Sequence, residues 1–277
     1  REEKMVLLIK EGYWSREKED EISRIKKEVS DLQINDSAHD FQHVMRVYNN
    51  AKKICKKESR AEKESSEARR MTKPFYIAFE GIEGCGKTTQ ALRLAESLRV
   101  LDPGTVLTRE TGGTNIGARI REVLHDIGNT HLDPIAEALL IAGDRAQHRS
   151  EVLEPALSAG HHVVSDRSVY SSIAYQGYGR QLPLDTVRSV NDWALQSRWP
   201  DLIFLLDVPH EHAMSRLAHR ALDRFEQEDG DFFSRVADGF QTMATDDPSR
   251  WIIIDATGDV DVISATVRQA VTERLGL

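Results

Sequence analysis

One segment of the chain has the residue types and spacing that bind a nucleoside triphosphate. Residues 81–88 read Gly-Ile-Glu-Gly-Cys-Gly-Lys-Thr and fit the pattern G-x-x-x-x-G-K-[ST]. The glycines let the backbone curl so that successive N–H groups point at phosphate oxygens. Lys87 is expected to reach the β- and γ-phosphates, and Thr88 is expected to hold Mg²⁺. A glycine-rich turn without a ligand is the alternative. The residues predicted to bind ATP are Gly81, Ile82, Glu83, Gly84, Cys85, Gly86, Lys87, Thr88 and Thr89.

The elements around this motif indicate an α/β fold. Five short runs are apolar almost throughout, and amphipathic segments with helical spacing lie between them. Continuous rather than alternating apolar runs are typical of strands covered on both faces, so we expect a parallel sheet flanked by helices. The predicted class is a P-loop NTPase-type, five-stranded parallel sheet with helices on both faces. The predicted strands are Phe75–Glu80, Val106–Glu110, His162–Asp166, Leu202–Asp207 and Trp251–Asp255.

Composition excludes several classes of protein. The chain has 277 residues, of which 40% are hydrophobic and 30% charged, which favours a packed core. No apolar run approaches the roughly 20 residues that span a bilayer, and no secretory signal opens the chain. The net charge is −8, and it divides into +2 for residues 1–72 and −10 for the rest, so the part after residue 72 is a poor general binder of nucleic acid. Two cysteines, Cys55 and Cys85, suit a reducing compartment, and the expected location is the cytoplasm.

The first 70 residues are predicted to form a separate helical extension. Apolar residues recur there at helical spacing, and the stretch 56–70 is almost purely charged and small, typical of a linker. We therefore place a domain boundary before Met71, with residues 71–277 forming the second domain. Because the chain does not begin with Met, its true start is expected to be missing or processed.

Six blocks of sequence stand out across residues 73–277: Phe79–Gln90, Thr108–Thr114, Asp144–His148, Asp166–Arg167, Ser171–Gly177 and Leu222–Glu228. In their order and spacing they resemble the thymidylate kinase family. This set is far more specific than the phosphate loop alone. The resemblance implies an enzyme that transfers the γ-phosphoryl group of ATP to dTMP, with Mg²⁺ as cofactor, and a homodimer.

The resemblance also implies the residues that bind dTMP. Arg145 is expected to cover the base face with its planar guanidinium, and Arg167 to pair with the monophosphate. Asp166 is expected to be a carboxylate of the Mg²⁺ site, together with Thr88. The predicted dTMP-binding residues are Glu83, Arg109, Arg121, Ile141, Arg145, Arg167, Ser172, Tyr175 and Gln176.

The stretch 216–229 resembles the family's mobile lid. Arg220 and Arg224 are expected to close over ATP and to spread charge on the transferred group. In this family an arginine comes either from the phosphate loop or from the lid, and the loop position here is Gly84. The predicted catalytic residues are Lys87, Arg167, Arg220 and Arg224. No general base is expected, and five histidines are interpreted as surface or helix-end residues: His125, His131, His148, His161 and His162.

Three positions depart from the family's pattern. Thr111 stands in place of a proline, Ser168 in place of an aromatic residue, and Ile141 in place of the phenylalanine that stacks on thymine. The last departure weakens the expected preference for thymine, because the π-face is lost. It leaves open a kinase for another nucleoside monophosphate such as dUMP.

A fainter resemblance lies in the extension. Residues 37–54 resemble the first metal-ligand helix of an HD-type phosphohydrolase, with His43 as the matching ligand. The later ligands of that family do not follow, so we interpret the stretch as a truncated remnant. The alternative is an interaction module that carries a vestigial kinase.

Overall fold

The computed structural model describes residues 73–218 and 221–276. The predicted extension 1–70, its linker and the boundary before Met71 lie outside the described residues. Of the residues that the structure describes, no helix combines the length and apolar character needed to cross a membrane.

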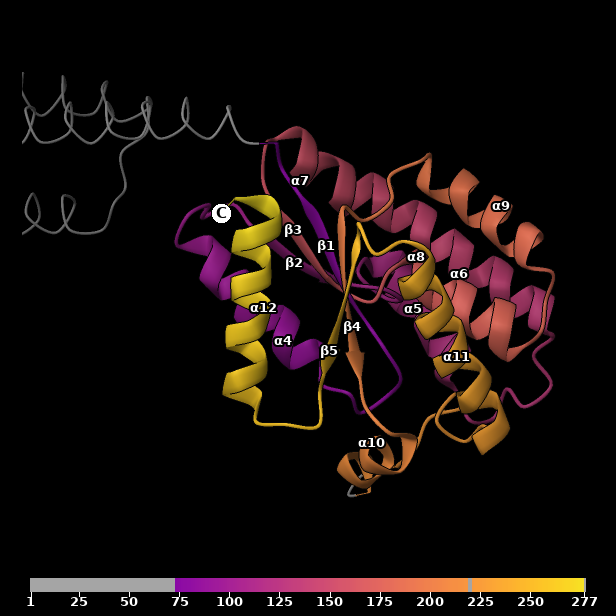
Figure 1. The fold of residues 1–277 in the computed structure, drawn as a ribbon. Coiled ribbons are helices and arrows are strands. Elements are labelled where there is room, and N and C mark those ends of the chain that lie inside the picture. Colours follow the sequence, from indigo (N-terminus) through magenta and orange to yellow (C-terminus); the bar gives the residue numbers. More distant parts are fainter. Residues whose placement is uncertain (1–72, 219–220, 277) are drawn as a thin grey trace, which may run out of the picture. The chain divides into compact units, whose positions relative to one another are not determined.

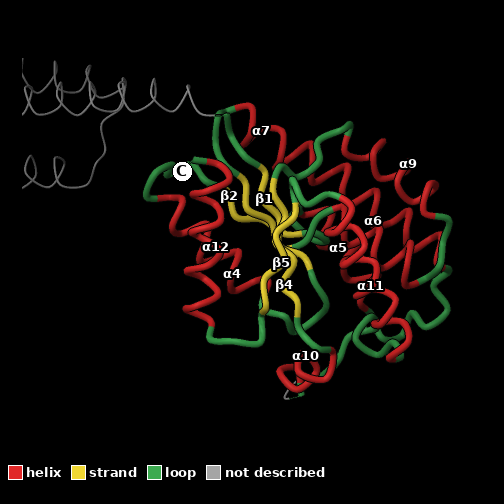
Figure 2. Tube along the Cα trace, viewed as in Figure 1, coloured by secondary structure: helices red, strands yellow, loops and turns green. Residues whose placement is uncertain are grey.

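A five-stranded sheet lies at the centre of the described region (Figures 1 and 2). Its strand order is β2-β3-β1-β4-β5, and every neighbouring pair is parallel. Ile77 of β1, for example, pairs with Val164 of β3 on one side and with Leu202 of β4 on the other. The strands are β1 (Tyr76–Glu80), β2 (Val106–Arg109), β3 (Val163–Asp166), β4 (Leu202–Asp207) and β5 (Trp251–Asp255).

Helices cover both faces of this sheet, which confirms the predicted fold class. Figure 1 shows α4 (Lys87–Arg99) and α12 (Val260–Leu275) on one side. The helices α6 (Pro134–His148), α8 (Val169–Ser172), α9 (Leu184–Leu195) and α11 (Gly230–Asp246) lie on the other side. The remaining helices are α5 (Asn115–His125), η1 (Arg149–Leu153), α7 (Glu154–Ser158), η2 (Ile173–Gly179) and α10 (His210–Leu217), of which η1 and η2 are π-helical.

The core forms where the apolar strands meet these helices. All five residues of β1 are buried, and so are the first five of β4. Phe79 and Phe204 stack across neighbouring strands with ring centroids 5.2 Å apart. Because β1, β2 and β3 are parallel, their carboxyl ends meet at one edge, where open α/β sheets bind ligands.

Candidate active site

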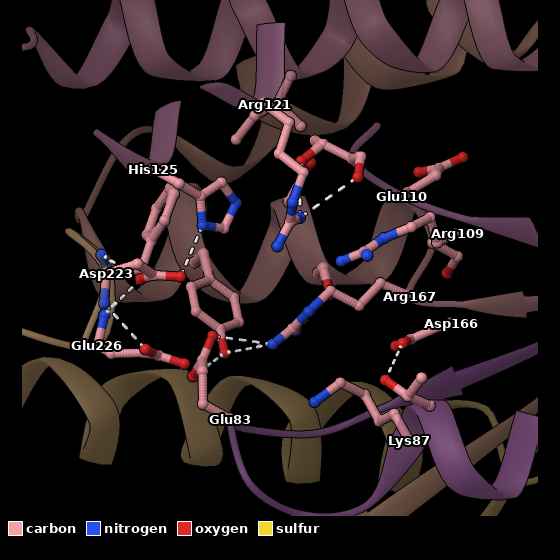
Figure 3. A pocket seen from close by; sticks show the side chains of 18 of the residues that line it. Glu83, Lys87, Arg109, Glu110, Arg121, His125, Asp166, Arg167, Asp223 and Glu226 are labelled. Carbon is pink, nitrogen blue, oxygen red and sulfur yellow. Dashed lines mark hydrogen bonds and ion pairs between the residues drawn. The ribbon is translucent and has the colours of Figure 1, made fainter. Parts of the chain in front are cut away.

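A cavity of about 360 Å³ lies at the carboxyl ends of these strands. Figure 3 shows it from close by. All nine residues predicted to bind dTMP are among those that line it: Glu83, Arg109, Arg121, Ile141, Arg145, Arg167, Ser172, Tyr175 and Gln176. Of the phosphate loop, Gly84, Lys87 and Thr88 also line the cavity, whereas Gly81, Ile82, Cys85, Gly86 and Thr89 do not.

The phosphate loop connects β1 to α4. Gly81, Gly84 and Gly86 all have positive φ, a backbone conformation that residues with a Cβ rarely adopt. A Cβ at Gly84 would lie 2.3 Å from the carbonyl oxygen of Ala213 in α10. No side chain fits there, so the loop itself supplies no arginine at this position. Lys87 is buried and its Nζ donates to the carbonyl oxygens of Gly81, at 3.0 Å, and Ile82, at 2.7 Å.

The two predicted Mg²⁺ ligands lie against each other at the edge of the cavity. The hydroxyl of Thr88 donates to Oδ2 of Asp166 at 2.5 Å. A hydroxyl and a carboxylate are hard oxygen donors of the kind that Mg²⁺ prefers. Within residues 73–218 and 221–276, no three or more His, Cys, Asp or Glu residues form a metal-binding group. Mg²⁺ usually keeps several waters and takes one or two carboxylates plus phosphate oxygens, so this sparse pair fits it.

Three arginines converge on one part of the cavity. Figure 3 shows the side chains of Arg109, Arg121 and Arg167 turned toward a common space. Burial, together with the like charges of Arg109 and Arg167, lowers the pKa of Arg121 to about 10. The charged guanidinium is therefore unfavourably placed, and an anion bound beside it would stabilise the charge.

Arg167 is held in place from several directions. It follows β3 with a φ of 72°, and its guanidinium donates to Glu83 Oε1 at 2.8 Å and to Ser171 Oγ at 3.0 Å. The hydroxyl of Tyr175 donates to the other oxygen of Glu83 at 2.7 Å. Beneath this group, Glu80 is fully buried and accepts hydrogen bonds from backbone and side-chain groups of Ser171 and Ser168.

Ser168, one of the departures from the family pattern, therefore has a defined role. Its hydroxyl donates to Glu80 at 2.7 Å. The same oxygen lies 3.4 Å from the backbone N–H of Tyr170 at the start of α8. An aromatic residue could make neither contact. Sequence reasoning gave this position no function, because the carboxylate that binds it lies 88 positions earlier in the chain.

Arg145 is almost completely buried, at 1% exposure. Its nitrogens donate to Glu110 Oε2 at 2.8 Å, to Ser172 Oγ at 2.9 Å and to Asn191 Oδ1. Arg145 is among the residues that line the cavity, and contact of its planar face with the base stays a prediction. Although burial opposes ionisation of Glu110, Arg145 and His148 lower the pKa of its carboxyl group.

Two histidines take part in the site although sequence reasoning assigned them no role there. His148 ends α6, as a helix-end residue should, but it is fully buried, and its Nδ1 lies 3.0 Å from Glu110 Oε1. His125 ends α5 and lines the cavity, with its Nδ1 2.7 Å from Oδ2 of Asp223. Its position at the end of an amphipathic helix leading from Arg121 was the available signal.

The predicted lid is only partly described, because Arg220 lies outside the described residues. Arg224 does not line the cavity; it donates to the carbonyl oxygen of Leu124 at 2.7 Å and to Glu137 at 2.7 Å. Asp223, Phe225 and Glu226 line the cavity instead. Arg216, which was not predicted, donates to the carbonyl oxygens of Gly84, at 3.2 Å, and Ala256, at 2.8 Å.

Comparison with known proteins agrees with this geometry. The family model described as "Thymidylate kinase" matches residues 79–267. A thymidylate kinase of an Exiguobacterium species is 43% identical over 202 residues, covering 73% of this chain and 95% of the relative. That of Desulforudis audaxviator is 45% identical over 193 residues, covering 69% of this chain and 87% of the relative.

A solved structure gives the same result. The crystal structure of thymidylate kinase from Ehrlichia chaffeensis is similar with a TM-score of 0.59 and 32% identity, over 72% of this chain and 98% of that one. The chain therefore belongs to the thymidylate kinase family, whose members are ATP-dependent kinases of a nucleoside monophosphate.

Proposed function

We propose that the cavity binds dTMP beside ATP and that the γ-phosphoryl group passes from ATP to the 5′-phosphate of dTMP, giving ADP and dTDP. The observation that carries this assignment is the convergence of Arg109, Arg121 and Arg167, with the pKa of Arg121 lowered to about 10. A nucleoside monophosphate carries the anion that such a cluster attracts. Lys87, from the phosphate loop, lies at the same cavity and would contact the triphosphate.

No proton has to be removed from the acceptor. The second pKa of a phosphate monoester is about 6, so its oxygen is already ionised at neutral pH. The chain's own residues therefore need to align the two phosphates and to neutralise their charge. Arg167 is suited to both tasks, because Glu83 and Ser171 fix its guanidinium beside the cavity.

Arginines of the lid would complete the neutralisation. Arg220 is proposed to meet the transferred group, since Gly84 cannot carry a side chain. Arg216 is a second candidate, because it already contacts the carbonyl oxygen of Gly84. The contacts of Arg224 with Glu137 and Leu124 favour anchoring of the lid over contact with phosphate.

Thr88 and Asp166 would hold Mg²⁺. The ion would supply positive charge at the β- and γ-phosphates during transfer. This assignment is supported by the contact between the two side chains and by their oxygen donors.

A homodimer and a cytoplasmic location also belong to the proposal. The dimer is supported by exposed apolar side chains on α5, α6 and the connection between them: Ile116, Val123, Ile127, Ile135 and Leu139. Clusters of this kind mark interaction surfaces. Light scattering should give twice the chain mass, and a monomer mass would contradict the dimer. The cytoplasmic location is supported by the cysteine content alone.

An ADP-release assay across a panel of nucleoside monophosphates tests the main proposal. Purified protein with ATP and Mg²⁺ should release ADP fastest with dTMP and more slowly with dUMP. Higher kcat/KM with any other monophosphate would refute the assignment of dTMP as the substrate of this cavity.

A further inference from the structure

Glu137 is a buried carboxylate for which the reaction described above has no use. It lies on α6 one helical turn before Ile141 and two turns before Arg145, so it shares the helix face that borders the cavity. It is 0% exposed, and it does not itself line the cavity. A carboxylate in this position is costly to bury unless it is paired, so the groups that pair with it indicate its role.

Three side chains donate to Glu137. Gln176 Nε2 donates to Oε1 at 2.8 Å. Arg224 donates to Oε2 at 2.7 Å, and Arg180 donates to both oxygens at 3.2 Å. Arg180 also pairs with Glu228 of the predicted lid at 2.6 Å. Gln176 and Arg180, at the end of η2, and Arg224, in the predicted lid, hold the carboxylate from two segments, so it has little freedom to turn.

This arrangement fixes the side-chain amide of Gln176. A carboxylate only accepts hydrogen bonds, so the amide has to turn its NH₂ group toward Glu137 and its carbonyl oxygen away. Gln176 is 1% exposed and lines the cavity, and its Oε1 has no hydrogen-bond partner among the described residues. A buried carbonyl without a partner is unfavourable, and a ligand that brings a donor would satisfy it.

The donor on the ligand follows from the chemistry of dTMP. At neutral pH, dTMP has two strong donors, the imide N3–H of the base and the 3′-hydroxyl of the sugar. The arginine cluster is assigned to the phosphate end of the cavity. Gln176 is hydrogen-bonded to Glu137 of α6, the helix that carries Ile141 and Arg145, which are the residues predicted to contact the base. The base is therefore the nearer part of the nucleotide.

We propose that Glu137 is a positioning residue that orients Gln176 so that its carbonyl oxygen accepts the imide N–H of the pyrimidine. This inference rests on the proposed binding of dTMP in the cavity. It explains a preference for thymine and uracil, which carry that N–H, over cytosine, whose N3 is an acceptor and would oppose the carbonyl.

Glu137→Gln gives the direct test. The variant keeps the shape of the side chain but can donate to Gln176, which frees the amide to turn over and to offer NH₂ to cytosine. We expect the ratio of kcat/KM for dTMP to that for dCMP to fall about tenfold or more. The ratio for dTMP to dUMP should not change, because both bases carry the imide. Where dCMP is not turned over, its inhibition constant replaces kcat/KM.

Two further variants distinguish a changed orientation of the Gln176 amide from a general loss of packing around the cavity. Gln176→Leu removes the carbonyl and should lower the dTMP/dCMP ratio by itself, and adding Glu137→Gln to it should have no further effect on that ratio. Glu228→Gln is the matched control, because it breaks the pair with Arg180 and leaves the contact between Glu137 and Gln176 in place. Its dTMP/dCMP ratio should equal that of the parent.

Three results would overturn the inference. One is an unchanged ratio of kcat/KM for dTMP to that for dCMP in folded Glu137→Gln. Another is a fall in the dTMP/dUMP ratio of this variant that equals the fall in its dTMP/dCMP ratio. If Glu137→Gln does not fold, an unchanged ratio in Gln176→Leu has the same meaning. Failure of the parent protein to phosphorylate dTMP would refute the proposed function instead, and the parent measurement shows this separately.

Discussion

Replacement of Arg121 should strengthen the fold and weaken substrate binding at the same time. At pH 7 Arg121 is charged, because its pKa of about 10 lies well above that pH. A pKa lowered to about 10 means that the folded site disfavours the charge by ~3 kcal/mol before solvent screening. Arg121 is half-buried, so solvent screening reduces the effect to ~1 kcal/mol. Arg121→Met keeps most of the apolar stem and removes the charge.

The two hydrogen bonds that Arg121 would lose are weak. Its guanidinium lies 3.3 Å from the carbonyl oxygen and 3.4 Å from the hydroxyl of Thr111. The free energy of unfolding should therefore rise by ~1 kcal/mol, which corresponds to about 2–4 °C in Tm for a domain of this size. Binding of dTMP should weaken about 10- to 100-fold, because a charged hydrogen bond contributes about 1.5–3 kcal/mol.

Thermal unfolding and steady-state kinetics measure the two effects. The KM for dTMP should rise while the KM for ATP stays near the parent value. Arg198→Met is the matched control, since Arg198 lies outside the cavity and pairs with Glu154. It should leave both KM values unchanged and should not raise Tm. A lower Tm with an unchanged KM for dTMP in Arg121→Met would refute the assignment of Arg121 to the phosphate end of the cavity.

Four further outcomes are expected. Lys87→Ala should lower turnover about 10²-fold or more with the fold intact; near-parent turnover would contradict its role at the triphosphate. Asp166→Asn should raise the Mg²⁺ concentration for half-maximal activity about tenfold, and an unchanged Mg²⁺ titration would remove it from the metal site. Ile141→Phe should lower the KM for dTMP and leave that for ATP unchanged, since base stacking contributes about 1–3 kcal/mol; a higher KM would mean that residue 141 does not face the base. A shortened chain that begins at Met71 should phosphorylate dTMP at the parent rate, and loss of activity would show that the preceding residues are needed.

The sheet was predictable because each of its strands is a short, nearly continuous apolar run. The first strand was predicted from Phe75 and begins at Tyr76, and the third was predicted from His162 and begins at Val163. Strands buried on both faces leave this signature in the sequence. Arg109 and Asp166 are the last residues of β2 and β3, so the predicted strand ends also indicated where these two site residues lie.

The partners of buried charges were not predictable, because they come from distant parts of the chain. Glu137 binds Gln176, 39 positions later, and Arg224, 87 positions later. The same fact explains why Arg224 differs from expectation. An arginine in the predicted lid was expected to meet phosphate, but a fully buried carboxylate lies within its reach. A charge that is buried without a partner is far more costly than one that faces solvent, so Arg224 pairs with Glu137.

The acidic composition and the binding of phosphate are compatible because the carboxylates around the cavity are already engaged. Glu83 accepts from Arg167 and Tyr175, and the Asp166 carboxylate accepts from Thr88. Within residues 73–218 and 221–276, no carboxylate forms an ion pair with Arg109 or Arg121. The positive charge of these two guanidiniums is therefore available to attract an anionic ligand, although the net charge of the chain is −8. The acidic net charge after residue 72 disfavours a broad polyanion-binding surface there, whereas the pairing of individual side chains decides where a single phosphate can bind.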